Sequence, residues 1–172
     1  MSARRLTTAQ ALVAFLAAQH VERDGVTAPL FAGVLGIFGH GNVAGIGQAL
    51  QQDGRLRYVL PRNEQAMVHT AVAYAKQRHR LQTWACTSSI GPGATNMVTG
   101  AALATINRLP VLLLPGDVFA SRRPNPVLQQ LELPGRPDAS VNDTLEWNID
   151  GALMSLIPSF FQAVQFLTPT LV

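Results

Sequence analysis

Two short segments of the chain carry the residues that could do chemistry. In the first, Glu64 stands at the first turn of a predicted helix built from small residues, directly after a strand-like run. In the second, residues 88–96 read SSIGPGATN, a glycine-rich turn that leads into another predicted helix. A lone carboxylate and a glycine-rich turn, each following a strand, indicate a ligand held at the carboxyl ends of parallel strands.

Glu64 has two interpretations. As an acidic residue near a helix N-terminus, it interacts favourably with the helix dipole by up to about 1 kcal/mol. As a carboxylate in a dry site at a strand end, it can share or pass a proton with a nitrogen of a ligand. Spacing alone favours the first interpretation.

The other polar candidates are equally open from the residues alone. The turn from Gly91 to Gly93 is either a phosphate cradle or a tight turn that needs unusual backbone angles, and it lacks the lysine of a P-loop. His40 is either a ligand-contacting histidine or an exposed turn residue. His69, inside the small-residue helix, is interpreted as structural, and Cys86, in an apolar run, as a buried core thiol.

Composition limits the class of protein. The chain has 172 residues, of which 48% are hydrophobic and only 13% are charged, a low charged fraction for a free-standing domain. This predicts either a surface that is covered or a part of a larger protein. The net charge of +3 comes from scattered arginines, which gives a nucleic-acid function little support. The single cysteine excludes a disulfide framework. We see no signal peptide or membrane-spanning run, so the expected location is cytoplasmic.

Strand-like and helix-like patterns alternate along the chain. A capping box at Thr7 and Gln10 predicts a first helix that runs to about Val21, followed by a polar loop over residues 22–29. Expected strands cover residues 30–38, 56–60, 81–87 and 111–114, and expected helices cover residues 43–51, 63–78 and 94–106. The strands are apolar without alternation, so the prediction is a flavodoxin-like, doubly wound α/β fold with a mainly parallel sheet and helices on both faces.

The chain divides into three predicted parts. Residues 1–120 form the domain core, residues 121–150 a proline-rich loop and the end of the domain, and residues 151–172 a divergent apolar tail without any charged residue. The tail is apolar enough to need covering, and the expectation is a truncated or altered C-terminus.

Two motifs resemble those of a known family. Residues 62–65 read RNEQ and lead into a small-residue helix that ends in AYA at residues 73–75, and residues 87–96 read TSSIGPGATN. In this order the two motifs are similar to those of the N-terminal pyrimidine-binding domain of thiamine-diphosphate-dependent enzymes. Further stretches resemble a branch of that family that hydrolyses a carbon–carbon bond of a cyclic diketone: residues 6–12, 36–43, 85–89, 110–117, 126–130 and 140–143.

The resemblance implies roles for individual residues. Glu64 would hydrogen-bond the pyrimidine nitrogen of thiamine diphosphate and favour the tautomer that activates the cofactor. The cofactor-binding residues would be Glu64 with Asn96 and, lining the pyrimidine pocket and holding no phosphate, Gly91, Pro92 and Gly93. His40, in a loop that approaches substrate in this family, and Gln129 would complete the catalytic set.

The resemblance also implies what the chain lacks. In this family a separate C-terminal domain, usually of a neighbouring subunit, holds the diphosphate through Mg²⁺, and its G-D-G…N pattern is not found here. We therefore expect no metal ligands in this chain, missing middle and diphosphate-binding domains, no activity of the chain alone, and a homo-oligomer at full length. The alternatives left open are an acetolactate-synthase-like or decarboxylase-type domain of the same family, and a degenerate domain that only binds a partner.

Overall fold

Four parallel strands form the central sheet of the protein, in the order β4-β3-β5-β6. The computed structural model describes residues 5–116 and 128–129. The strands are β3 (Phe31–Ile37), β4 (Arg57–Val59), β5 (Thr83–Ser88) and β6 (Leu112–Pro115). All four match predicted strands, and the central strand β5 is buried along its whole length.

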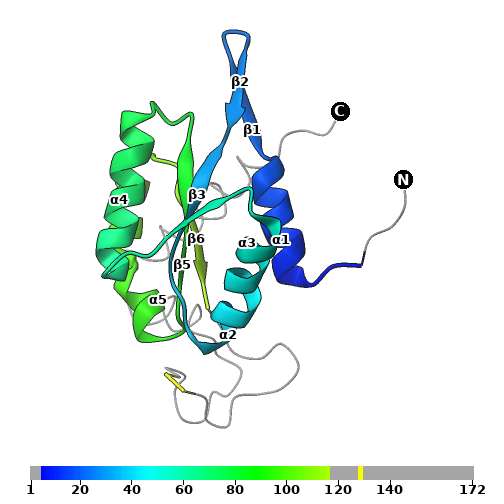
Figure 1. Cartoon of the computed structure of the whole chain (residues 1–172). Helices are drawn as coiled ribbons and strands as arrows, with labels where there is room; N and C mark the ends of the chain where they lie inside the picture. Colours follow the sequence, from blue (N-terminus) through cyan, green and yellow to red (C-terminus); the bar gives the residue numbers. More distant parts are fainter. Residues whose placement is uncertain (1–4, 117–127, 130–172) are drawn as a thin grey trace.

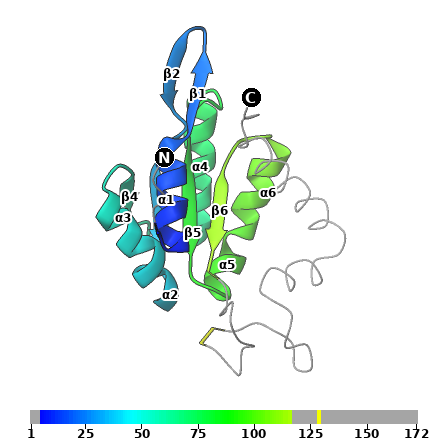
Figure 2. The ribbon, with the colours of Figure 1, turned by 90° about the vertical axis from the view of Figure 1, so that its right-hand side faces the viewer.

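Helices cover both faces of this sheet (Figures 1 and 2). The helices α1 (Thr8–Ala18) and α3 (Gln48–Asp53) lie on one face, and α4 (Glu64–Gln77) and α6 (Val98–Ile106) lie on the other. Every connection between neighbouring strands of the sheet passes through a helix, as parallel pairing requires. The predicted doubly wound α/β fold is confirmed.

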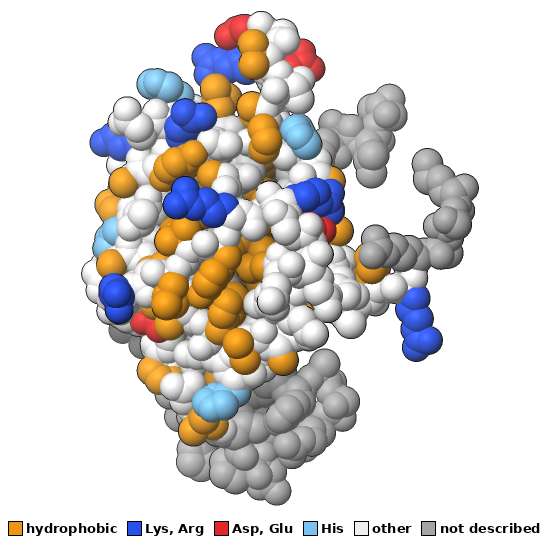
Figure 3. All heavy atoms as spheres, viewed as in Figure 1, with side chains coloured by type: hydrophobic (Ala, Val, Ile, Leu, Met, Phe, Trp, Pro, Cys, Tyr) orange, Lys and Arg blue, Asp and Glu red, His pale blue; other side chains and the backbone are white. Residues whose placement is uncertain are grey.

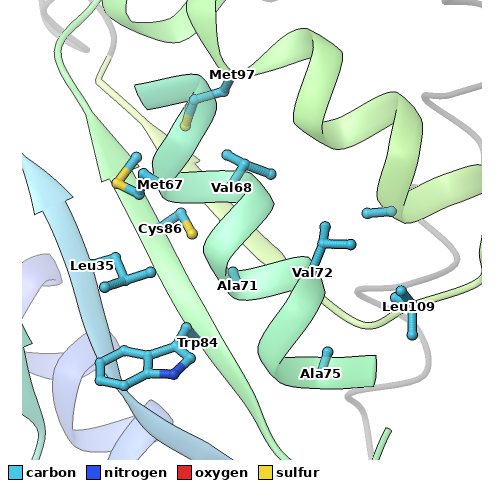
Figure 4. Close-up of a cluster of buried hydrophobic side chains, with 11 residues drawn as sticks. Leu35, Met67, Val68, Ala71, Val72, Ala75, Trp84, Cys86, Met97 and Leu109 are labelled. Carbon is cyan, nitrogen blue, oxygen red and sulfur yellow. The ribbon is translucent and has the colours of Figure 1, made fainter. Parts of the chain in front are cut away.

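Each face of the sheet has its own apolar core. Between the sheet and α4, buried side chains of Met67, Val68 and Cys86 pack with Trp84 and Met97 (Figure 4). On the opposite face, α1 and α3 pack against the strands through a second group: Val13, Leu16, Phe31, Val34, Ala49, Leu50, Leu56 and Ala85. Cys86 is a core thiol, as predicted, and burial raises the pKa of its thiol to about 12.

The predicted polar loop over residues 22–29 is wrong. The first helix ends at Ala18, and the chain then forms an antiparallel hairpin of β1 (His20–Arg23) and β2 (Val26–Pro29). The turn between them has positive φ at Asp24 (54°) and Gly25 (75°), the conformation for which Asp-Gly is favoured in two-residue hairpins. The Asp-Gly dipeptide is the sequence signal for this hairpin. The loop was predicted instead because the segment is polar.

Two predicted helices are less regular than expected. The predicted helix over residues 43–51 starts earlier and is irregular: α2 (His40–Asn42) is followed by a π-helical turn (Val43–Gly47) and then by α3. The predicted helix over residues 94–106 is divided at Met97 into α5 (Pro92–Asn96) and α6. Both irregularities lie in the helical segment that follows a strand of the sheet.

The edge strand β4 leaves apolar side chains at the surface. Tyr58 is 40% exposed and Leu60 is 61% exposed, and hydrophobic side chains occupy the middle of the face shown in Figure 3. Tyr58 is stacked on Phe38 and donates a hydrogen bond to the Gly36 carbonyl, which fixes it against β3. Within the described part of the chain, no helix is both long and apolar enough to cross a membrane. The predicted segments 121–150 and 151–172 lie outside the described residues, except for Leu128 and Gln129.

Candidate functional site

The loops that follow the parallel strands meet at one end of the sheet, the lower end in Figure 1. The carbonyl oxygen of Ser88, at the end of β5, accepts a hydrogen bond of 2.9 Å from the backbone N–H of Gly116, just after β6. The same oxygen accepts a bond of 3.2 Å from Nδ2 of Asn42, in the segment after β3. The carboxyl ends of three neighbouring strands are thus joined by direct contacts.

Glu64 is the first residue of α4 and faces this end of the sheet. Asn63 caps the helix with its side-chain oxygen, which accepts a bond of 3.0 Å from the Ala66 N–H. Met67 and Val68, one turn further along, are fully buried in the core. The cap fixes where the helix starts and the core contacts fix its rotation, so together they place the half-buried Glu64 side chain.

Within the described part of the chain, the Glu64 carboxylate has one hydrogen-bond partner. Oε2 accepts a hydrogen bond of 2.8 Å from Nδ2 of Asn96, the last residue of α5. Among the residues that the structure describes, Oε1 has no donor. This contact joins the two motifs that the sequence places in separate helices, and it leaves one carboxylate oxygen available to a ligand.

Gly93 packs closely against the groups around that oxygen. A Cβ atom at this position would lie 3.3 Å from Glu64 Oε1 and would overlap the Ser89 hydroxyl. A side chain at residue 93 would therefore displace the groups around the carboxylate. The close approach of backbone that the glycine permits is a feature of ligand sites, where a ligand must lie against the main chain.

Gly91 meets a second part of the site. Its φ of 70° is in the left-handed region, and a Cβ atom there would overlap the carbonyl oxygen of Gln129. The backbone of Gln129 therefore lies against the Gly91 turn. Pro92 is exposed at the first turn of α5, where its fixed φ suits a helix start.

His40 lies on the neighbouring loop. It is exposed at the start of α2, and Gly39 before it lies so close to Ser89 that a Cβ atom on Gly39 would be 2.7 Å from Ser89 Cβ. The structure thus brings Glu64, Gly93 and Asn96 into direct contact. It places the loops of His40 and Gln129 beside the same turn. Among the described residues no hydrogen bond joins either of these two side chains to Glu64.

The donor set fits one end of an aromatic heterocycle and does not fit a metal ion. A half-buried carboxylate with a free oxygen, next to a side-chain-free backbone segment, suits a flat ring that carries a nitrogen able to share a proton. Within the described residues there is no group of three or more His, Cys, Asp or Glu side chains that could hold a metal ion.

The fold and this site define the class of protein. The profile of the family described as "Thiamine pyrophosphate enzyme, N-terminal TPP binding domain" matches residues 6–136. The chain belongs to this family, and the resemblance inferred from its two motifs is confirmed.

Individual proteins with similar sequences give a more specific comparison within this family. The chain is 51% identical over 174 residues to 3D-(3,5/4)-trihydroxycyclohexane-1,2-dione hydrolase 1 of Bacillus cereus, and the match covers 98% of this chain and 27% of that protein. The hydrolases of the same name from Bacillus anthracis and Bacillus thuringiensis are 51% and 50% identical over the same length. The chain thus spans about a quarter of the length of these relatives, and it matches their N-terminal part.

One group at the site was not predicted from the sequence. Asn42 donates to the Ser88 carbonyl and, at 3.3 Å, to the Thr87 hydroxyl. Of the segment GHGN at residues 39–42, only His40 was predicted to take part in the site. Only the sheet order, which puts β3 beside β5, shows that Asn42 faces Thr87 and Ser88.

Proposed function

We propose that this chain is the cofactor-activating, pyrimidine-binding domain of a thiamine-diphosphate-dependent hydrolase that opens the ring of trihydroxycyclohexane-1,2-dione. The observation that carries the proposal is the Glu64 carboxylate, held by Asn96 through one oxygen and free at the other, beside Gly93. The relatives' names supply the reaction and substrate, and the family supplies the cofactor.

Glu64 would act on the pyrimidine end of the cofactor. Its free oxygen Oε1 would share a proton with a ring nitrogen, while Asn96 keeps the carboxylate from turning away. Gly93 would let the ring lie against the backbone, and Gly91 with Pro92 would shape the turn that borders it. When bound, thiamine diphosphate supplies a carbon nucleophile and an electron sink for carbon–carbon bond cleavage.

His40 and Gln129 would face the substrate. Both belong to loops that border the Gly91–Gly93 turn, so they are available to a ligand that lies beyond the cofactor ring. The overall reaction is hydrolysis of the bond between the two adjacent oxo carbons. Water adds across that bond and opens the ring. One of the two carbons becomes a carboxylic acid and the other becomes an aldehyde of the same open-chain product. His40 would hold or deliver a proton at a substrate oxygen.

The rest of the active site would come from protein outside this chain. The described residues contain no group of three or more His, Cys, Asp or Glu side chains that could hold a metal ion. We therefore assign the Mg²⁺ and diphosphate contacts to a separate diphosphate-binding domain, in a neighbouring subunit of a homo-oligomer or in a second chain. We further assign the complete enzyme to the cytoplasm and to the breakdown of myo-inositol.

A chimera tests this function. In it, this chain replaces the matching N-terminal segment of the Bacillus cereus hydrolase, which supplies the remaining domains. Glu64→Gln should lower kcat by about 10² to 10⁴, the range for loss of a proton-transferring group, with little change in the far-ultraviolet circular dichroism spectrum.

Glu22→Gln, in the hairpin strand β1 that Figure 1 shows at the opposite end of the sheet, is the matched control and should leave kcat unchanged. Full activity of the Glu64→Gln chimera would refute the role of Glu64. A chimera that is folded and binds thiamine diphosphate, yet fails to hydrolyse the cyclic dione, would refute the proposed substrate.

A further inference from the structure

Asn42 attaches the loop that carries His40 to the end of the central strand. Its Nδ2 atom donates to two groups of β5, the Ser88 carbonyl at 3.2 Å and the Thr87 hydroxyl at 3.3 Å. Among the described residues, these are the side-chain hydrogen bonds that connect the segment of residues 39–42 to the sheet. His40 itself makes none there.

The two groups that Asn42 contacts are buried, and both also take part in other hydrogen bonds. Thr87 and Ser88 have no exposed surface. The Thr87 hydroxyl donates to the Leu114 carbonyl at 2.8 Å, so it must accept from Asn42. The Ser88 carbonyl also accepts from the Gly116 N–H at 2.9 Å. Asn42 therefore completes a polar junction between the ends of β3, β5 and β6.

Backbone contacts keep the junction tight. Besides the contact of Gly39 with Ser89, a Cβ atom on Gly116 would lie 2.9 Å from the Ile90 nitrogen and 3.3 Å from Asn42 Nδ2. The loops therefore have little free volume in which to shift as long as the Asn42 amide stays in place. Loss of its two donor bonds would leave the buried Ser88 carbonyl and the buried Thr87 hydroxyl with one hydrogen-bond partner each instead of two, and would release the His40 loop.

We propose that Asn42 is a positioning residue for the substrate side of the site: it sets the place of His40 relative to the cyclic diketone by fixing residues 39–42 to the end of β5. The inference rests on the proposed function, because it assumes that His40 meets the substrate. It assigns Asn42 no contact with substrate or cofactor.

The test uses the chimera described above with Asn42→Ala, His40→Ala and the double variant. Asn107→Ala is the matched control: its amide also donates to a backbone carbonyl, that of Leu103 at 2.8 Å, but at the C-terminal end of α6. The readouts are kcat and KM for the cyclic dione, the affinity for thiamine diphosphate, and amide hydrogen exchange of peptides that cover residues 38–47.

Positioning through His40 predicts a specific pattern. Asn42→Ala should lower kcat/KM by about tenfold or more, with thiamine diphosphate affinity within about twofold of the parent. Exchange should accelerate in residues 38–47 and stay unchanged in α1. In the His40→Ala background, removal of Asn42 should have little further effect on kcat/KM, whereas Asn107→Ala should change none of these quantities.

Other outcomes overturn the inference. Equal, multiplicative losses from the two single variants would show that Asn42 does not act through His40. Unchanged kcat/KM with uniformly faster exchange would show a structural role only. If Asn42→Ala fails to fold, Asn42→Ser, which retains one donor, must recover part of kcat/KM, and a folded but inactive Ser variant overturns the proposal. None of these results alters the outcome for Glu64→Gln, so the proposed function is judged separately.

Discussion

The two oxygens of the Glu64 carboxylate have different environments, and the proposed role of the residue depends on this difference. Oε2 is bound by Asn96, and Oε1 lies beside the side-chain-free backbone of Gly93. A carboxylate without Asn96 could rotate to water, as glutamates at helix starts do. The helix dipole also stabilises Glu64, so the two interpretations of the residue are compatible.

Loss of the Asn96 amide should cost stability because the acceptor is charged. Asn96→Ala should lower the free energy of unfolding by about 1 to 2 kcal/mol, a value reduced for the partial exposure of Glu64. Asn107→Ala removes a bond of the same length, 2.8 Å, to a neutral and exposed carbonyl, and should cost about 0.5 kcal/mol or less. Urea unfolding monitored by circular dichroism checks both. An equal loss for the two variants would mean that Asn96 does not restrain the carboxylate.

The Cys86 thiol should be unreactive in the folded protein. Burial in the core raises the pKa of its thiol from 9.0 to about 12, so almost no thiolate exists at pH 8. An aromatic disulfide reagent should therefore label the protein only in denaturant. Because the pKa is higher in the folded state, the thiol's contribution to stability is full below pH 9 and falls as the pH rises toward 12. Rapid labelling of native protein at pH 8 would contradict this burial.

The residue types at the site could be chosen from the sequence, but their contacts could not. Glu64 and the glycine-rich turn are visible as motifs after strands. The bond between Glu64 and Asn96 spans 32 positions in the chain and depends on how α4 and α5 pack. The junction made by Asn42 likewise spans 45 and 46 positions and needs the order of the strands. Sequence spacing alone does not show such partners.

At the scale of elements, α4 and α6 approach closely because both carry small residues. A Cβ atom on Gly100 would lie 2.5 Å from Cβ and 2.6 Å from Cγ1 of Val68. The two helices share one apolar core on the same face of the sheet (Figure 4). Because α4 begins at Glu64, the spacing of the two helices also sets the place of the Glu64 carboxylate.

Gly100→Ala should therefore destabilise the protein by about 1 to 3 kcal/mol through overpacking. Gly41→Ala is the control, because a Cβ atom there would meet nothing within 4 Å, while both substitutions gain the same helix propensity. Val68→Ala in the Gly100→Ala background should recover part of the loss. Thermal unfolding measures all three. A stability of Gly100→Ala equal to that of Gly41→Ala would contradict the packing described here.

Sequence periodicity predicted the type of the long elements correctly. It failed where local turn chemistry decides the structure. The four sheet strands and α4 were predicted within a few residues, because buried parallel strands are largely apolar runs and α4 is a long segment built from small residues. The hairpin at residues 20–29 was missed, because its strands are short and mostly exposed and carry no apolar pattern. The π-helical turn after β3 has no sequence signal that we can identify.

At the scale of the whole molecule, the proposed function assigns this chain one half of a cofactor site. The described residues place the Glu64 carboxylate beside Gly93 and contain no group of three or more metal-ligating side chains, and apolar side chains are exposed along β4. A surface with few charges and an uncovered edge is typical of a domain that meets other protein. The small share of the relatives' length that the chain spans agrees with this view.

Cofactor binding should therefore depend on the rest of the enzyme. In isothermal titration calorimetry with thiamine diphosphate and Mg²⁺, the chain alone should give no measurable heat of binding, because most of the affinity of a diphosphate comes from its charge-assisted contacts and metal ion. The chimera with the Bacillus cereus domains should bind, and it should lose binding when Mg²⁺ is removed with a chelator. The Glu64→Gln chimera should still bind, since the diphosphate contacts lie elsewhere. Tight binding by the chain alone would mean that residues 1–172 contain a complete site, and the division of the site between domains would then be wrong.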